Sequence, residues 1–129
     1  MMIHLEKCPT GIKGFDEICE GGLPRGRPTL LAGSAGSGKT LFSMGFVLNG
    51  VLNYNEPGVF VSFEESPSDL TINVASLGHD LSQLQAENRL RLVHIHIDPH
   101  EQMESGDFDL EGMFVRLGAA IDGPYLKKR

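Results

Sequence analysis

The chain has 129 residues, which is enough for one domain with its own hydrophobic core. Its 11 basic and 17 acidic residues give a net charge of −6, which argues against a basic surface for nucleic acid or membranes. No apolar run reaches the roughly 18 residues of a membrane helix, and the N-terminus lacks a secretory signal, so we expect a cytoplasmic protein. Two widely spaced cysteines are too few for a disulfide framework.

The first 27 residues are rich in glycine and show little periodicity. Phe15 and Ile18 predict one apolar face of a short helix, and the glycines and proline of residues 21–26 then force a turn. The apolar run Pro28–Ala32 predicts the first strand. Because this run does not alternate, it is typical of a parallel sheet covered on both faces.

The next segment, Gly33–Thr40, has the spacing G-x-x-x-x-G-K-T between an apolar strand and a helix. Its glycines let successive N–H groups point inward as a nest for phosphate. We expect Lys39 to reach the β- and γ-phosphates and the Thr40 hydroxyl to ligate Mg²⁺. The pattern predicts binding of a nucleoside triphosphate with Mg²⁺, and we include Ser34 of this loop among the nucleotide contacts.

A helix is predicted from Lys39 to about Asn53, apolar on more than one side and therefore buried. Val59–Phe63 is the second predicted strand. Ser66, followed by a proline, is the expected N-cap of a third helix that runs to Gly78.

Asp80 opens a further short helix through a capping box and is followed by a third predicted strand, Leu90–Ile97. A last helix is predicted from about Asp109. Strands that alternate with helices indicate a three-layer α/β fold with a mostly parallel sheet.

Two acidic residues, Glu64 and Glu65, directly follow the second predicted strand. Ligands of open α/β sheets lie beyond the carboxyl ends of the strands, so either residue could polarise a water molecule beside the γ-phosphate. The alternative is a pair that only solubilises the strand end. His94, His96 and His100 lack ligand partners at zinc-like spacing, and we leave them unassigned.

Several segments together resemble the KaiC family of circadian-clock ATPases, most closely its N-terminal ATPase domain, along nearly all of the chain. The segments that carry this resemblance are Gly14–Ile18, Gly21–Pro24, Gly33–Ser43, Glu56–Pro67 and Phe108–Leu110.

The resemblance implies a RecA-like P-loop ATPase that forms a homo-oligomeric, in the family hexameric, ring with ATP and Mg²⁺ between subunits. It implies that Glu64 is the catalytic base with Glu65 as its partner, that Thr40 is the Mg²⁺ ligand and that Ser76 lies near the nucleotide base. The positions that match triphosphate contacts are Gly36, Ser37, Gly38, Lys39, Thr40 and Leu41.

In the family, a further apolar strand ending in an acidic residue, the Walker B strand, follows the last helix. It would begin where this sequence ends, so we expect residues 1–129 to be the N-terminal part of an incomplete RecA-like domain. The missing strands would separate Pro28–Ala32 from Val59–Phe63. These two strands therefore either lack their neighbours or pair directly with each other, and we favour the first arrangement.

The expected function is ATP binding and, in the complete protein, slow hydrolysis by a ring ATPase in circadian-type or signalling regulation, with regulatory protein partners. One alternative is a RecA- or DnaB-like DNA-dependent ATPase, against which the acidic balance argues. Another is a non-catalytic oligomerisation module, against which the pair Glu64 and Glu65 argues.

Overall fold

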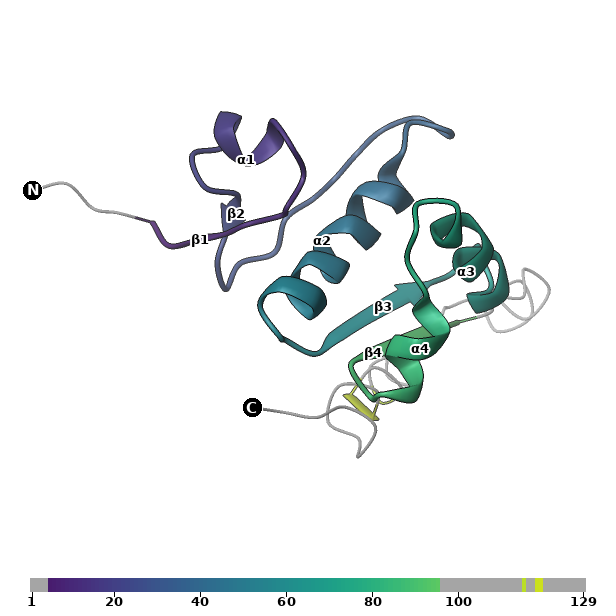
Figure 1. Ribbon diagram of the computed structural model, residues 1–129. Helices are drawn as coiled ribbons and strands as arrows, with labels where there is room; N and C mark the ends of the chain where they lie inside the picture. Colours follow the sequence, from purple (N-terminus) through teal and green to yellow (C-terminus); the bar gives the residue numbers. More distant parts are fainter. Residues whose placement is uncertain (1–4, 96–114, 116–117, 120–129) are drawn as a thin grey trace, which may run out of the picture. The chain divides into compact units, whose positions relative to one another are not determined.

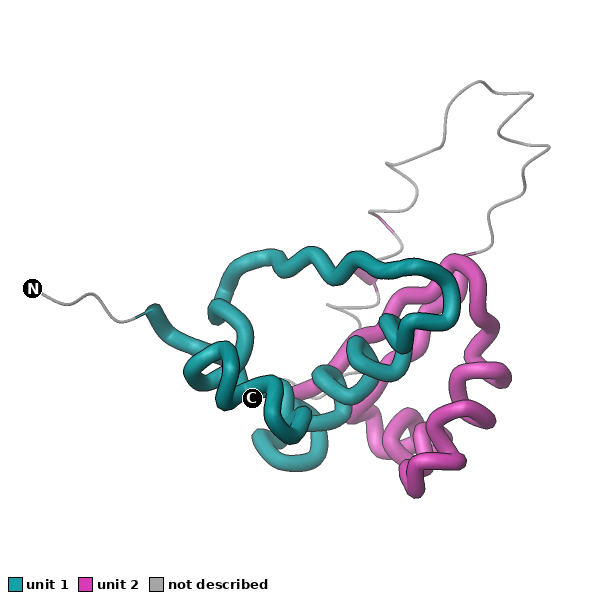
Figure 2. The backbone as a smooth tube through the Cα atoms, turned by 90° about the horizontal axis from the view of Figure 1, so that it is seen from above, with its two compact units in different colours: residues 1–55 teal, residues 56–129 magenta. Residues whose placement is uncertain are grey.

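A computed structural model of the chain describes residues 5–95, 115 and 118–119. These residues form a mixed α/β structure in which short strands alternate with helices (Figure 1). The chain divides into two compact units, residues 1–55 and residues 56–129, which Figure 2 shows in separate colours. In the described part of the chain, no helix is long and apolar enough to cross a membrane.

The first unit contains two helices and one pair of very short strands. Strand β1 (Lys7–Cys8) pairs antiparallel with β2 (Leu23–Pro24), and helix α1 (Phe15–Ile18) lies between them in the chain. Helix α2 (Lys39–Asn53) follows the glycine-rich loop. Both helices confirm the sequence prediction, whereas the pair of two-residue strands was not predicted.

A carboxylate organises the turn that leads into α1. Asp16 Oδ1 accepts hydrogen bonds from the Thr10 hydroxyl at 2.6 Å and the Thr10 N–H at 3.0 Å, and its Oδ2 accepts the Gly11 N–H at 3.0 Å. The Thr10 side chain is fully buried. These bonds, the one from the Thr10 hydroxyl above all, lower the pKa of Asp16 because they stabilise its charged form.

Helix α2 is held to the rest of the first unit at two points. The Phe42 ring packs edge-on against Phe15 of α1, with 4.9 Å between the ring centroids. The Asn49 side-chain amide donates a hydrogen bond of 3.1 Å to the Pro9 carbonyl. The fully buried residues of α2, Met44, Leu48 and Val51, lie on one helical face. Phe42 and Phe46 on another side of the helix are half-buried, while Leu41 and Leu52 are exposed.

The predicted strand at Pro28–Ala32 is wrong. These residues do not form a strand, and the Leu30 side chain is 91% exposed. A strand exists only where a neighbour accepts and donates its backbone hydrogen bonds, and the described residues provide no such neighbour for this segment. The strand that follows it in the sequence pairs elsewhere, so the two predicted strands do not pair with each other.

The second unit is built around a parallel pair of strands. Strand β3 (Gly58–Ser62) pairs with β4 (Leu90–His94), and helices α3 (Pro67–Ala75) and α4 (Leu81–Ala86) connect them. These elements confirm the predicted second and third strands and the two helices between them, with the described ladder ending at Ile95. The end of the predicted third strand and nearly all of the predicted last helix lie outside the described residues.

Local capping and apolar spacing explain these two helices. Ser66 Oγ accepts the Asp69 N–H at 3.2 Å, and Asp80 Oδ1 accepts the Gln83 N–H at 3.2 Å, as the sequence predicts for N-caps. Apolar residues of α3, of α4 and of the segment that starts with β4 then form the buried core of this unit: Leu70, Val74, Leu81, Leu84, Leu90, Leu92 and Ile95.

Replacing Asp16 with Asn should lower the free energy of unfolding by about 1–3 kcal/mol at about pH 7, because hydrogen bonds to a charged acceptor are lost. The lowered pKa means that the native carboxylate stabilises the fold above its ordinary pKa of 3.8, and that this stabilisation is lost as the pH falls through the lowered value. Urea denaturation should therefore give a smaller difference between the two proteins at about pH 3. The exposed neighbour provides the control: a matching loss in Glu17→Gln would assign the effect to net charge.

Candidate functional site

The glycine-rich loop of residues 33–38 makes a tight turn before α2. The Ser37 N–H donates to the Ser34 carbonyl at 3.2 Å. Gly36 and Gly38 have φ angles of 78° and 93°, in the left-handed region that favours glycine. Residues with side chains would adopt this backbone only at a cost, so both glycines are needed for the path of the chain.

The loop ends where α2 begins. Gly38 is the N-cap residue, and the first helical hydrogen bond runs from the Phe42 N–H to its carbonyl at 2.9 Å. Thr40 is half-buried in the first turn, next to the exposed Leu41. The N–H groups of a first helical turn point along the axis out of the helix, toward the loop and any anion held there.

Lys39 folds back over the loop. Its ammonium group donates a hydrogen bond of 2.6 Å to the Gly33 carbonyl, six residues earlier. A Cβ atom at Gly33 would lie 2.5 Å from Ser37 Oγ, so the two arms of the loop approach each other closely there. The loop therefore presents backbone donors and one cation within a few residues, the combination that phosphate requires.

The second unit carries the predicted carboxylates. Glu64 is exposed and Glu65 is half-buried, two and three residues after the end of β3. The Glu65 N–H donates to Ser62 Oγ at 3.0 Å, and the Glu65 side-chain Oε2 accepts a hydrogen bond of 3.3 Å from the amide of Asn73 on α3. Glu65 is thus attached both to the end of its own strand and to the following helix.

Ser76, the residue matched to the nucleotide base, is the C-cap of α3. Its hydroxyl donates a hydrogen bond of 2.6 Å to the carbonyl of Asn73. Asn73, which the sequence analysis missed, therefore contacts Glu65 through its side chain and Ser76 through its backbone carbonyl. A weak signal was present, because an asparagine is an unfavourable residue inside a helix unless its amide has a partner.

The predicted site residues fall into both units. Ser34, Gly36, Ser37, Gly38, Lys39, Thr40 and Leu41 lie in the first unit, and Glu64, Glu65 and Ser76 lie in the second. Among the described residues, no group of three or more His, Cys, Asp or Glu side chains could hold a metal ion. His94 is half-buried on β4, while His96 and His100 lie outside the described residues.

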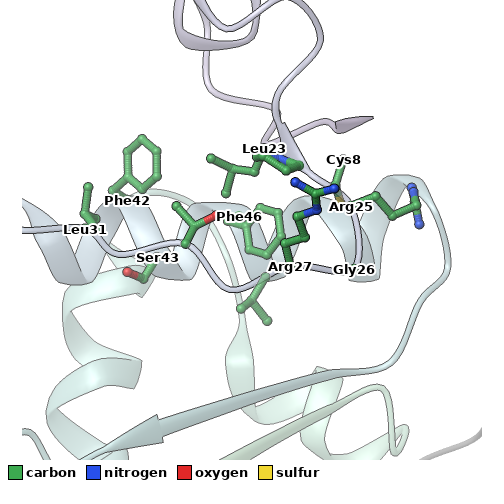
Figure 3. A pocket seen from close by; sticks show the side chains of 12 residues that line it. Cys8, Leu23, Arg25, Gly26, Arg27, Leu31, Phe42, Ser43 and Phe46 are labelled. Atoms are coloured by element: carbon green, nitrogen blue, oxygen red, sulfur yellow. The ribbon is translucent and has the colours of Figure 1, made fainter. Parts of the chain in front are cut away.

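The first unit also contains a cavity of about 350 Å³ beside α2. Phe42 and Phe46 of α2 line one side, and the segment that precedes the loop lines the other, with Arg25 and Arg27 among its residues (Figure 3). The lining includes none of residues 33–40, so the glycine-rich loop does not contribute to this cavity. It lies where the unpaired segment that includes Leu31 runs beside the helix.

Comparison with known proteins gives a consistent result. The protein-family model described as "ATPase: KaiC" matches residues 8–127. The chain is 56% identical over 120 residues to "Circadian clock protein KaiC2" of Synechocystis sp., an alignment that covers 93% of this chain and 21% of the relative.

Two further relatives carry the description "Circadian clock oscillator protein KaiC". The protein of Prochlorococcus marinus is 48% identical over 92% of this chain and 24% of its own length. The protein of Synechococcus elongatus is 47% identical over 91% of this chain and 22% of its own length. The chain thus spans less than a quarter of the length of these relatives.

Two glycines of α2 and its cap should respond oppositely to alanine. Gly38→Ala should destabilise the fold by about 1 kcal/mol or more, because a Cβ is strained at φ 93° although no atom lies within 4 Å of it. Gly50→Ala, inside the helix and with equally open space, should stabilise by about 0.5–1 kcal/mol. Thermal unfolding of the two variants measures both effects. Equal shifts of the same sign would show that the loop conformation imposes no strain.

Proposed function

Because this chain belongs to the KaiC family of ATPase domains, we propose that it binds ATP through the loop of residues 33–40. We propose further that the whole protein hydrolyses ATP slowly, within a ring of identical subunits, and uses the cycle in clock-type or signalling regulation. For the fold, we propose that this mixed α/β structure is the N-terminal part of a three-layer RecA-like domain. The observation that carries the proposal is the loop itself, with two left-handed glycines and a lysine beside them.

Binding of the triphosphate begins with an exchange of hydrogen bonds at Lys39. Its ammonium group, which donates to the Gly33 carbonyl, turns to the β- and γ-phosphate oxygens. The N–H groups of the loop and of the first turn of α2 donate to the same phosphates. Ser34 and Ser37, whose backbone groups close the turn, fix the width of this cradle.

The residues present fit a magnesium ion that arrives with the nucleotide. Mg²⁺ keeps several water ligands and takes only one or two ligands from the protein beside phosphate oxygens. Thr40, in the first turn of α2, supplies a hydroxyl of the type used for this purpose. When bound, the ion neutralises negative charge on the phosphate oxygens.

Hydrolysis requires a group that orients and deprotonates water. We assign this role to Glu64, which is exposed, whereas the carboxylate of Glu65 is hydrogen-bonded to α3. Glu64 accepts a proton as the water oxygen bonds to the γ-phosphorus and the bond from phosphorus to the bridging oxygen breaks. ADP and phosphate are the products. Ser76 is placed near the nucleotide base by the same proposal.

The phosphate-binding role is tested by titrating the chain with ATP and Mg²⁺. Lys39→Ala should weaken the affinity about tenfold or more, because one charge-assisted hydrogen bond to phosphate is lost. Lys13→Ala, an exposed lysine of the same unit outside the loop, is the matched control and should bind as the unchanged chain does. Equal affinity in the unchanged chain and Lys39→Ala would remove the loop from the binding site.

The catalytic role is tested by phosphate release from the full-length protein. Glu64→Gln keeps the size of the side chain but cannot accept the proton, so kcat should fall about 10²- to 10⁴-fold while ATP affinity is retained. Glu56→Gln, an exposed glutamate before β3, should leave turnover unchanged. An unaltered kcat in Glu64→Gln would favour a non-catalytic role for the glutamate pair.

A further inference from the structure

Asn73 forms hydrogen bonds with two residues of the proposed site in the second unit. Its side-chain amide donates to Glu65 Oε2 at 3.3 Å, and its backbone carbonyl accepts the Ser76 hydroxyl at 2.6 Å. Glu65 lies after β3 and Ser76 caps the end of α3. The side chain of Asn73 therefore contacts Glu65 after β3, and its backbone carbonyl contacts Ser76 at the end of its own helix.

Packing does not account for Asn73. The core-facing residues of α3 are Leu70 and Val74, each 1% exposed, whereas Asn73 is exposed. Asparagine is less favourable inside a helix than alanine, leucine or lysine, by about 0.5 kcal/mol or more. An exposed helical position that does not contribute to the core would tolerate those residues. The property that distinguishes asparagine here is the hydrogen-bonding capacity of its side-chain amide.

The backbone of Glu65 is fixed independently of this amide. Its N–H donates to Ser62 Oγ at 3.0 Å, which holds the main chain at the end of β3. This bond leaves the side-chain torsions of Glu65 undetermined, and a long side chain loses considerable rotamer freedom when it is ordered. The hydrogen bond from Asn73 constrains the carboxylate that the main-chain bond does not.

We propose that Asn73 is a positioning residue, which holds the Glu65 carboxylate against α3. This inference rests on the proposed function. The tether keeps Glu65 beside α3, so that Glu64 is the carboxylate available to water.

The test compares three variants of the full-length protein with Mg²⁺ and ATP. Asn73→Leu removes the amide while keeping a similar shape, and it should lower kcat about three- to tenfold with the KM for ATP changed less than about twofold. Asn73→Gln retains an amide and should recover most of the loss. Asn53→Leu is the matched control, because Asn53 is an exposed asparagine of α2 whose amide donates to Asn49 Oδ1 at 2.7 Å.

The outcomes separate the two proposals. A selective fall of kcat in Asn73→Leu, with recovery in Asn73→Gln and normal turnover in Asn53→Leu, supports the positioning role. Turnover that is insensitive to Asn73→Leu, or that falls equally in Asn53→Leu, overturns this inference and leaves the ATPase proposal intact. If the unchanged protein neither binds nor hydrolyses ATP, the proposed function fails, and the inference fails with it.

Discussion

The backbone conformation of the loop is the constraint on which the first unit depends. The left-handed φ angles of Gly36 and Gly38 let the chain reverse within a few residues and enter α2 at Lys39. Once the start of α2 is fixed, the helix places Phe42 against Phe15 and the Asn49 amide on the Pro9 carbonyl. The same glycines that shape the proposed phosphate cradle therefore also position the helix that holds the unit together.

Local chemistry is the part of the fold that could be predicted from the sequence. The caps at Ser66 and Asp80 act within three residues, so a short pattern suffices to recognise them. The prediction of a strand at Pro28–Ala32 was wrong because strand formation is not a local property: an apolar run forms a strand only if a neighbouring strand pairs with it. The β1–β2 pair was missed because two-residue strands carry no periodicity.

The same distinction between local patterns and tertiary contacts applies to the residues of the candidate site. Fixed spacing identified the loop and its lysine, since the geometry of a phosphate cradle is contained in eight consecutive residues. Asn73 could not be found in this way, because its contact joins a helix residue to Glu65 in the loop after β3 and belongs to no fixed spacing pattern. An exposed asparagine on a helix looks like any solvent-facing polar residue until its partner is known. Tertiary contacts of this kind become visible only when the strand and the helix are placed.

Under the proposed function, the Lys39 contact accounts for how an acidic chain holds a polyanion. With a net charge of −6, long-range attraction does not favour ATP, so its binding energy has to come from groups in direct contact with phosphate. Before binding, the Lys39 ammonium is already hydrogen-bonded to the neutral Gly33 carbonyl, so the gain is an exchange of that acceptor for a charged one. The bond to the Gly33 carbonyl has one charged partner, whereas a bond to phosphate has charge on both partners and gains Coulomb energy from it. In the proposed mechanism, the carbonyl therefore holds the cation within the loop until the phosphate oxygens replace it as the acceptor.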